Sequence, residues 1–217
     1  GAHAYFTAET TLQGRELLKV GLGSNQAEIA YNSISGSAHD QVSVLDTLGI
    51  DLYVTEGKNA RVAKLNKNQG TTTYAANIMP SGADSALSPF AYSAKVNFVY
   101  KDKFYFSAYT ESEGYELWVT DEQGNSISKD INPGKSDSYP REFFVYNDEL
   151  YFSAITNTHG REIWKTDGNS IELAFDVFPG SSGSEAANFV EFNGLMYFSA
   201  NVMNKGKELV ATDGQSL

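Results

Sequence analysis

The chain has 217 residues, 41% of them hydrophobic and 13% aromatic, which excludes wholesale disorder and leaves room for one large all-β domain or two small ones. A formal net charge of -11, without any cluster of Lys or Arg, excludes nucleic acid and anionic membranes as partners. The sequence has no cysteine, which excludes disulfides and thiol catalysis, and it has no stretch of transmembrane length, so membrane insertion is not expected.

A short strand pattern with a tyrosine at its second position recurs along the whole chain. Its tyrosines are Tyr5, Tyr53, Tyr105, Tyr151 and Tyr197, at spacings of 48, 52, 46 and 46 residues. In four copies a glycine follows nine residues later, at Gly14, Gly114, Gly160 and Gly206, and a glutamate eleven residues later, at Glu16, Glu116, Glu162 and Glu208. This register predicts repeats over about residues 1–41, 42–94, 95–140, 141–186 and 187–217.

Each repeat reads as four strands joined by hairpins. In the fourth repeat the predicted strands are Phe144–Tyr146, Leu150–Ala154, Glu162–Thr166 and Ile171–Val177. Tight turns are expected at Asn147-Asp148 and Asp167-Gly168, and at Asn193-Gly194 and Asp213-Gly214 in the fifth repeat. A longer loop, Pro179–Ser184, crosses from the fourth repeat to the next. Three hairpin links and one crossing loop are typical of a propeller blade, whereas a β-helix has a shorter period and a β-sandwich does not repeat its sequence.

We therefore expect an all-β, single-domain β-propeller over residues 1–217, with about five four-stranded antiparallel blades. The first repeat begins at a second strand and the last stops after a third strand. Two hypotheses remain open: a five-bladed ring with two imperfect blades, which we favour, or a fragment of a larger propeller. The start at Gly1 is expected to be that of an excised domain.

The third strands of repeats three to five carry a recognisable motif. They read Tyr115-Glu116-Leu117-Trp118-Val119-Thr120-Asp121, Arg161-Glu162-Ile163-Trp164-Lys165-Thr166-Asp167-Gly168 and Lys207-Glu208-Leu209-Val210-Ala211-Thr212-Asp213-Gly214. This motif resembles a bacterial repeat family of secreted or surface β-propeller-like proteins, with the consensus Gly-Arg-Glu-Leu-Trp-Lys-Ser/Thr-Asp-Gly-Thr. The match is good in repeats three to five, partial in repeat one and poor in repeat two. The resemblance implies an extracellular or cell-surface bacterial protein for adhesion or ligand binding, and it brings no catalytic residues.

The candidate ligand-binding residues are Trp118, Trp164, Tyr115 and Arg161. Trp118 and Trp164 share one repeat position, where they could form a stacking platform for a sugar ring or pack between neighbouring blades. Leu18 and Val210 occupy the same position and favour packing, because they keep apolarity and lose stacking.

The repeated carboxylates each have two interpretations. The glutamates could act in acid–base hydrolysis, but their recurrence in separate blades favours a structural role, as ion-pair partners or backbone acceptors. Asp121, Asp167 and Asp213 could bind calcium, the one cofactor considered, although capping of their own turns is favoured.

The leading functional prediction is an extracellular, non-enzymatic, lectin-like binding or adhesion module. Its expected ligand is a glycan, with a surface protein second, and its partners would include further repeats or domains of a longer chain. The alternatives are a glycan-active hydrolase or lyase and a structural scaffold. An enzyme must break the repeat symmetry at one place, which we expect in the degenerate second repeat or in the Leu87–Lys95 insertion.

Overall fold

The computed structural model describes the backbone of residues 3–10, 14–21, 26–31, 43–48, 51–56, 61–66, 72–76, 97–121, 123 and 125–217. Contacts divide the chain into two compact units, one of Gly1–Ala86 with Thr120–Ser126 and the other of Leu87–Val119 with Ile127–Leu217. The expected Leu87–Lys95 insertion and most side chains of the first two repeats lie outside the described residues. The prediction of one domain over the whole chain stays a prediction.

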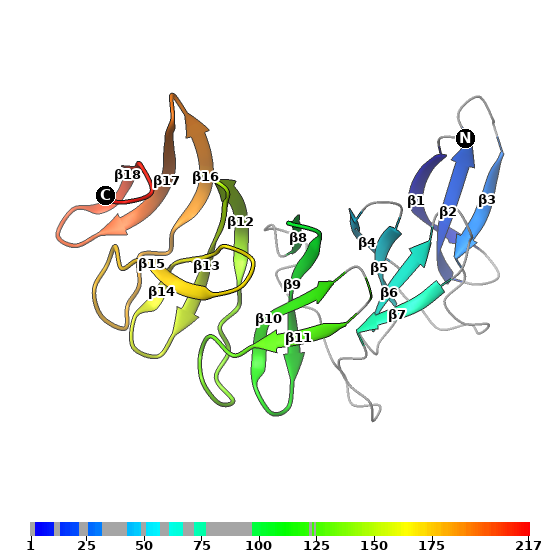
Figure 1. The fold of residues 1–217 in the computed structure, drawn as a ribbon, viewed down its shortest axis with the longest axis horizontal. Coiled ribbons are helices and arrows are strands. Elements are labelled where there is room, and N and C mark those ends of the chain that lie inside the picture. Colours follow the sequence, from blue (N-terminus) through cyan, green and yellow to red (C-terminus); the bar gives the residue numbers. More distant parts are fainter. Residues whose placement is uncertain are drawn as a thin grey trace. The chain divides into compact units, whose positions relative to one another are not determined.

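The described part of the chain is all β, and each predicted repeat contains one antiparallel meander sheet (Figure 1). The first two sheets are β1 (His3–Thr10), β2 (Gly14–Gly21) and β3 (Ala27–Tyr31), then β4 (Ser43–Leu48), β5 (Asp51–Glu56), β6 (Arg61–Asn66) and β7 (Thr72–Ala76). The third is β8 (Asn97–Tyr100), β9 (Lys103–Thr110), β10 (Gly114–Asp121) and β11 (Ser126–Lys129). The fourth is β12 (Arg141–Tyr146), β13 (Glu149–Thr156), β14 (Gly160–Thr166) and β15 (Ile171–Phe175), and the last is β16 (Ala187–Phe192), β17 (Leu195–Val202) and β18 (Gly206–Thr212).

The described residues confirm that the first and last repeats each lack one strand. The first and last sheets have three strands, and the three sheets between them have four. The repeat tyrosine Tyr5 lies on β1, in register with Lys19 of β2, as Tyr151 of β13 is with Lys165 of β14. The first sheet therefore begins at the position of a second strand.

The hairpins between the first and second strands follow the turn residues. Asn147 and Asp148 have φ values of 50° and 58°, and Asn193 and Gly194 have values of 51° and 74°. Two successive positive φ values are the mark of the two-residue turn that matches strand twist, so this prediction is confirmed. The Asp167-Gly168 turn differs, because four residues separate β14 from β15 and only Gly168 has a positive φ.

The fourth strand of the repeat is shorter than predicted. It was expected to run to Val177, but β15 ends at Phe175. The backbone N–H groups of Val177 and Phe178 leave the strand ladder and donate to the carboxylate of Glu162. A buried side-chain acceptor has thus replaced the neighbouring strand as hydrogen-bond partner.

Two apolar clusters fill the space between successive sheets in the second unit. The first joins β8–β11 to β12–β15 through Tyr100, Tyr105, Leu117, Val119, Ile131, Phe143, Leu150, Phe152 and Ala154. The second joins β12–β15 to β16–β18 through Tyr146, Tyr151, Ile163, Ala186, Met196, Phe198 and Ala200. The sheet β12–β15 therefore has an apolar cluster on each face, which explains the run of apolar residues in β13. No helix in the described residues is long and apolar enough to span a membrane.

Candidate functional site

The repeated glutamates fasten the loops that cross from one sheet to the next. Glu162 is fully buried and accepts hydrogen bonds from the backbone of Val177 at 2.9 Å and from the Ser184 hydroxyl at 2.8 Å. Glu116 repeats this arrangement with Ile131 at 2.8 Å and Ser138 at 2.6 Å. These side chains are backbone and hydroxyl acceptors, which is the structural role that their recurrence indicates.

The serine of each crossing loop also contacts the following sheet. The carbonyl of Ser138 accepts from the backbone N–H of Ile155 on β13 at 2.7 Å, and that of Ser184 accepts from Asn201 on β17 at the same distance. Each serine therefore connects the glutamate of its own repeat to the second strand of the next repeat. We call the glutamate, the serine and the crossing loop between them the loop anchor.

Close approach explains the repeated glycine at this end of the sheet. A Cβ atom on Gly160 would lie against the Gly183 backbone, 2.7 Å from its Cα, and Gly160 has a φ of +65°. Gly114 meets the crossing loop of its own repeat in the same way, because a Cβ atom there would lie 3.0 Å from the carbonyl oxygen of Lys135. Side chains at either position would push the crossing loop off the hairpin.

Burial raises the pKa of Glu116 to about 7, against the opposing effect of its hydrogen bonds with Ser138 and Ile131. Its second carboxyl oxygen, Oε1, is buried without a hydrogen-bond partner. Burial also raises the pKa of Glu162. The two loop anchors therefore place carboxyl groups where their ionised form is disfavoured.

Two equivalent positions next to the loop anchor carry different chemistry in neighbouring repeats. In repeat four, the buried Arg161 donates to the carbonyl of Tyr139 at 2.9 Å and forms an ion pair with Glu185 at 3.5 Å. Burial and the nearby Arg141 lower the pKa of Arg161 to about 10. In repeat three, Tyr115 and Tyr139 occupy these positions, and their rings stack with centroids 5.0 Å apart. An ion pair in one repeat has become an aromatic pair in the other.

A third tyrosine and an aspartate complete this group, which we call the tyrosine cluster: Tyr109, Tyr115, Tyr139 and Asp137. The Tyr109 and Tyr115 rings lie 5.2 Å apart and are tilted by 53°. Asp137 accepts from the Tyr115 backbone at 2.8 Å and is hydrogen-bonded to the Tyr139 side chain. Burial, reinforced by Asp137, raises the pKa of Tyr139 to about 12 and also raises that of Tyr115, so both hydroxyls stay protonated at neutral pH. All three rings are partly exposed.

Sequence reasoning found Tyr115 but missed Tyr109, Asp137 and Tyr139. The sequence did carry a signal, because these three residues differ from those at the equivalent positions of the next repeat. The equivalents, 46 positions later, are Ile155, Gly183 and Glu185. A search for recurring residues finds the residues that the repeats share. The tyrosine cluster is visible only as a departure from the repeat.

The two tryptophans are poorer candidates for a ligand platform. Trp164 is partly buried and packs against the apolar cluster between β8–β11 and β12–β15. The indole N–H groups of Trp118 and Trp164 are buried without a hydrogen-bond partner. Trp164 therefore packs between neighbouring sheets, which is the alternative to a sugar-binding role. Sugar stacking at Trp118 stays a prediction.

The three turn aspartates bind their own backbone. Asp167 accepts from the N–H groups of Asn169 and Ser170 at 2.8 and 2.9 Å, and these bonds lower its pKa to about 2. Asp213 does the same with Gln215 and Ser216, and Asp121 accepts from Asn125 at 2.8 Å. Across the described residues, no group of three His, Asp or Glu side chains could hold a metal ion. Calcium binding stays a prediction.

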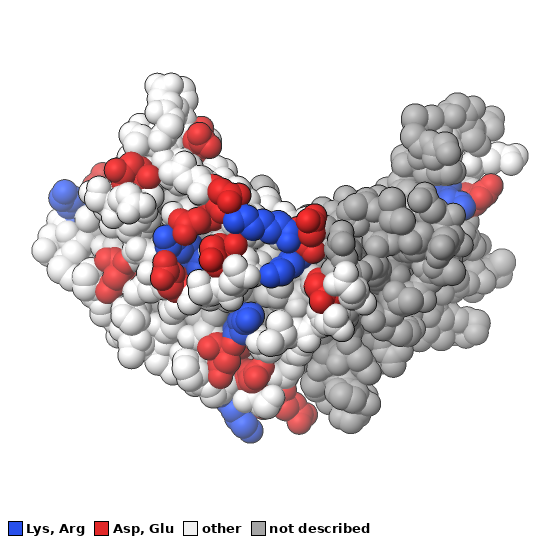
Figure 2. All heavy atoms as spheres, in the orientation of Figure 1, with Lys and Arg blue, Asp and Glu red and all other residues white. Residues whose placement is uncertain are grey.

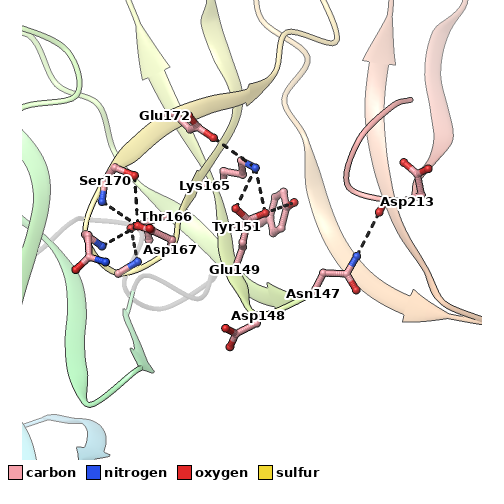
Figure 3. A network of polar contacts seen from close by, with 12 residues as sticks. Asn147, Asp148, Glu149, Tyr151, Lys165, Thr166, Asp167, Ser170, Glu172 and Asp213 are labelled. Carbon is pink, nitrogen blue, oxygen red and sulfur yellow. Dashed lines mark hydrogen bonds and ion pairs between the residues drawn. The ribbon is translucent and has the colours of Figure 1, made fainter.

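The hairpins at the opposite end of the strands form a network of their own (Figure 3). Lys165 pairs with Glu149 at 3.0 Å and with Glu172 at 3.4 Å, and the Asn147 amide donates to the Asp213 carbonyl at 3.2 Å. The Tyr146 hydroxyl likewise donates to the Gly194 carbonyl at 2.7 Å. Figure 2 shows acidic and basic side chains interleaved on this face of the described region, rather than gathered into a patch of one sign. The Asn147–Asp213 and Tyr146–Gly194 bonds join neighbouring repeats, whereas the ion pairs of Lys165 lie within the fourth repeat.

Comparison with known proteins identifies the fold alone. No family model and no curated protein sequence matches the chain. A structure of prolyl endopeptidase matches 98% of the chain and 32% of its own length, at 11% identity and a TM-score of 0.60. A puromycin hydrolase variant matches 91% of the chain and 31% of its own length, at 11% identity and a TM-score of 0.53. TolB from Acinetobacter baumannii matches with 14% identity over 99% of the chain and 51% of its own length, at a TM-score of 0.47.

The chain thus spans about a third of the length of the first two proteins. Together with the repeated antiparallel sheets, these two likenesses identify a β-propeller-like fold.

Proposed function

We propose that the chain is a non-enzymatic binding or adhesion module of an extracellular or cell-surface bacterial protein, that it is built of about five propeller blades, and that its ligand is a glycan. The observation that carries the proposal is the replacement of the Arg161–Glu185 ion pair by the stacked Tyr115–Tyr139 pair at equivalent repeat positions. A scaffold needs only the parts that recur. A departure that concentrates partly exposed aromatic rings at a loop end is what a ligand site requires.

The chemistry of the tyrosine cluster suits a neutral sugar. Aromatic faces accommodate the C–H face of a pyranose, and phenol hydroxyls donate and accept hydrogen bonds at its edge. The Asp137 carboxylate adds an acceptor beside Tyr139. A net charge of -11 disfavours an anionic glycan, so we expect a neutral hexose or a chain of neutral hexoses.

The five sequence repeats and the β-propeller-like fold support the blade architecture, and the resemblance to a family of secreted repeat proteins supports the location. Both are independent of the tyrosine cluster. Failure of glycan binding would therefore leave the fold assignment in place.

A glycan array read with calcium and with a chelator tests the proposal. We expect binding to a neutral glycan that is lost in Tyr115→Ala and kept in Tyr197→Ala, a matched control because Tyr197 is another partly exposed ring with one aromatic neighbour, Phe192. Binding only with calcium would place a metal in the site. An array without signal in both conditions contradicts the proposal and favours the scaffold.

The alternative is a glycan-active hydrolase or lyase, and the observation that favours it is Glu116. Its pKa of about 7 lies in the range of a general acid. Against this, Glu116 is fully buried and one of its oxygens is occupied by Ile131 and Ser138. Incubation of any glycan found on the array, followed by measurement of new reducing ends, separates an enzyme from a binding module.

A further inference from the structure

The last sheet, β16–β17–β18, exposes an apolar surface that its predecessors bury. Val190 and Phe192 on β16 are 52% and 63% exposed, and Leu209 on β18 is 74% exposed. Their equivalents 46 residues earlier are Phe144, Tyr146 and Ile163, which all pack in the cluster between β12–β15 and β16–β18. Within the second unit, the same sequence positions thus form an interface in one repeat and an exposed surface in the next.

The polar half of that interface is exposed as well. Arg161 is 3% exposed and Glu162 is fully buried, whereas their equivalents Lys207 and Glu208 both lie on the surface. Gly160 is held against a crossing loop, but a Cβ on Gly206 would meet nothing within 4 Å. Repeat five therefore displays the residues that receive a crossing loop in repeats three and four.

The outer edge of β18 completes this surface. In the fourth sheet β14 pairs with β13 on one side and with β15 on the other, but in the described part of the chain β18 pairs with β17 alone. An unpaired edge presents a row of backbone donors and acceptors that match an incoming strand. The unpaired edge, Leu209 and Glu208 therefore all lie on β18, and the other exposed apolar residues lie on the same sheet.

We propose that this surface is a docking site for a further repeat unit: a short strand that pairs antiparallel with β18, followed by a Pro-Gly loop and a serine. The proposed contact continues the interface that already joins the third sheet to the fourth and the fourth sheet to the fifth. By the register of β14 with β15, the incoming strand begins opposite Thr212 and reaches Leu209. Its serine hydroxyl then donates to Glu208, as Ser184 does to Glu162.

The chain's own residues 169–187 provide the probe, because they contain β15, the Pro-Gly loop and Ser184. A synthetic peptide of this sequence is added to the full 217-residue protein, and amide hydrogen exchange is followed by mass spectrometry. We expect exchange in β18 to slow by about tenfold or more at saturating peptide, while exchange in β1–β3 stays unchanged. The peptide with Leu173→Pro, which cannot pair as a strand, should give no protection.

Two variants of the contact test its chemistry. The Ser184→Ala peptide should bind more weakly by about fivefold to tenfold, because Glu208 loses its hydroxyl donor. The Leu209→Asp protein should lose the peptide, and Val145→Asp, a change at an exposed apolar residue of another sheet, should keep it. Circular dichroism of each variant separates lost binding from lost folding.

Several outcomes overturn the proposal. They are equal protection by the Leu173→Pro peptide, no protection by the parent peptide, and protection that appears in β14 instead of β18. Free protein in which β18 exchanges as slowly as β14 would show that something else covers the edge. Light scattering then tells whether this is the protein's own chain at monomer mass or a second copy at twice that mass, and either result excludes a further repeat unit as the occupant.

Discussion

The hydroxyl of Ser184 donates to the carboxylate of Glu162 over 2.8 Å, although 22 residues separate them. Around this bond the chain leaves one sheet and enters the next, since Ser184 also accepts from Asn201 of β17. The same pair recurs as Ser138 and Glu116. One buried hydroxyl and one buried carboxyl group thus meet at each of these two crossings, beside the apolar clusters that join the sheets.

Replacement of Ser184 by alanine should destabilise the protein. The change removes the donor to Glu162 and leaves a buried carboxylate with only its backbone partners, which costs about 1–3 kcal/mol of unfolding free energy. Urea unfolding followed by circular dichroism measures the loss. Ser199→Ala serves as control, because Ser199 is partly exposed and bonds to Ala187 and Asn188. An equal effect in both variants would contradict the loop anchor.

We expect the ionisation of Glu116 to lower the free energy of unfolding as the pH rises. Its pKa in the folded state is about 7, above the ordinary value of 4.5, so the unfolded chain releases this proton first. The contribution of the group is complete below pH 4.5 and is lost as the pH rises to about 7, a change of about 3 kcal/mol. Glu116→Gln cannot ionise, so the difference in unfolding free energy between variant and parent should shift in favour of the variant by this amount between about pH 4.5 and 8.

The measurement is a series of urea unfolding curves at fixed pH and ionic strength. Glu191→Gln is the control, because it removes a carboxyl group that is exposed. Parallel pH profiles for the parent and Glu116→Gln would mean that the carboxyl is ionised in the folded protein at about pH 5.

Arg161 and Glu185 form one ion pair but should respond very differently to substitution. Arg161 is buried and supplies donors to the carbonyl groups of Tyr139 and Ser153, so Arg161→Leu leaves buried acceptors unpaired and should cost about 3 kcal/mol. The Glu185 side chain is half exposed, and Glu185→Gln should cost less than about 1 kcal/mol. Thermal and urea unfolding of the two variants check the contrast, and similar losses would show that the ion pair matters more than the carbonyl contacts.

The sequence predicted the strands and their pairing because repetition supplied an internal alignment. Tyr105, Tyr151 and Tyr197 fixed the second strand, and Asn147 and Asn193 fixed its turn. The end of the fourth strand was wrong by two residues, because the pull of Glu162 on Val177 is a contact across 15 residues that no local pattern contains. The site was predicted only at Tyr115. Tyr109 and Tyr139 come from a second strand and a crossing loop, and they meet only once the hairpin and the loop are folded.

Trp164 and Tyr115 were predicted as one binding set, and their variants should separate. Trp164 packs against the apolar cluster between two sheets, so Trp164→Ala should cost about 2–4 kcal/mol of unfolding free energy and leave the glycan profile of the folded protein unchanged. Tyr115 is partly exposed, so Tyr115→Ala should cost less stability and abolish binding. Unfolding is followed by far-ultraviolet circular dichroism, and binding is measured below the unfolding midpoint of the weaker variant. Loss of binding in folded Trp164→Ala would move the site from the tyrosine cluster to the tryptophan position.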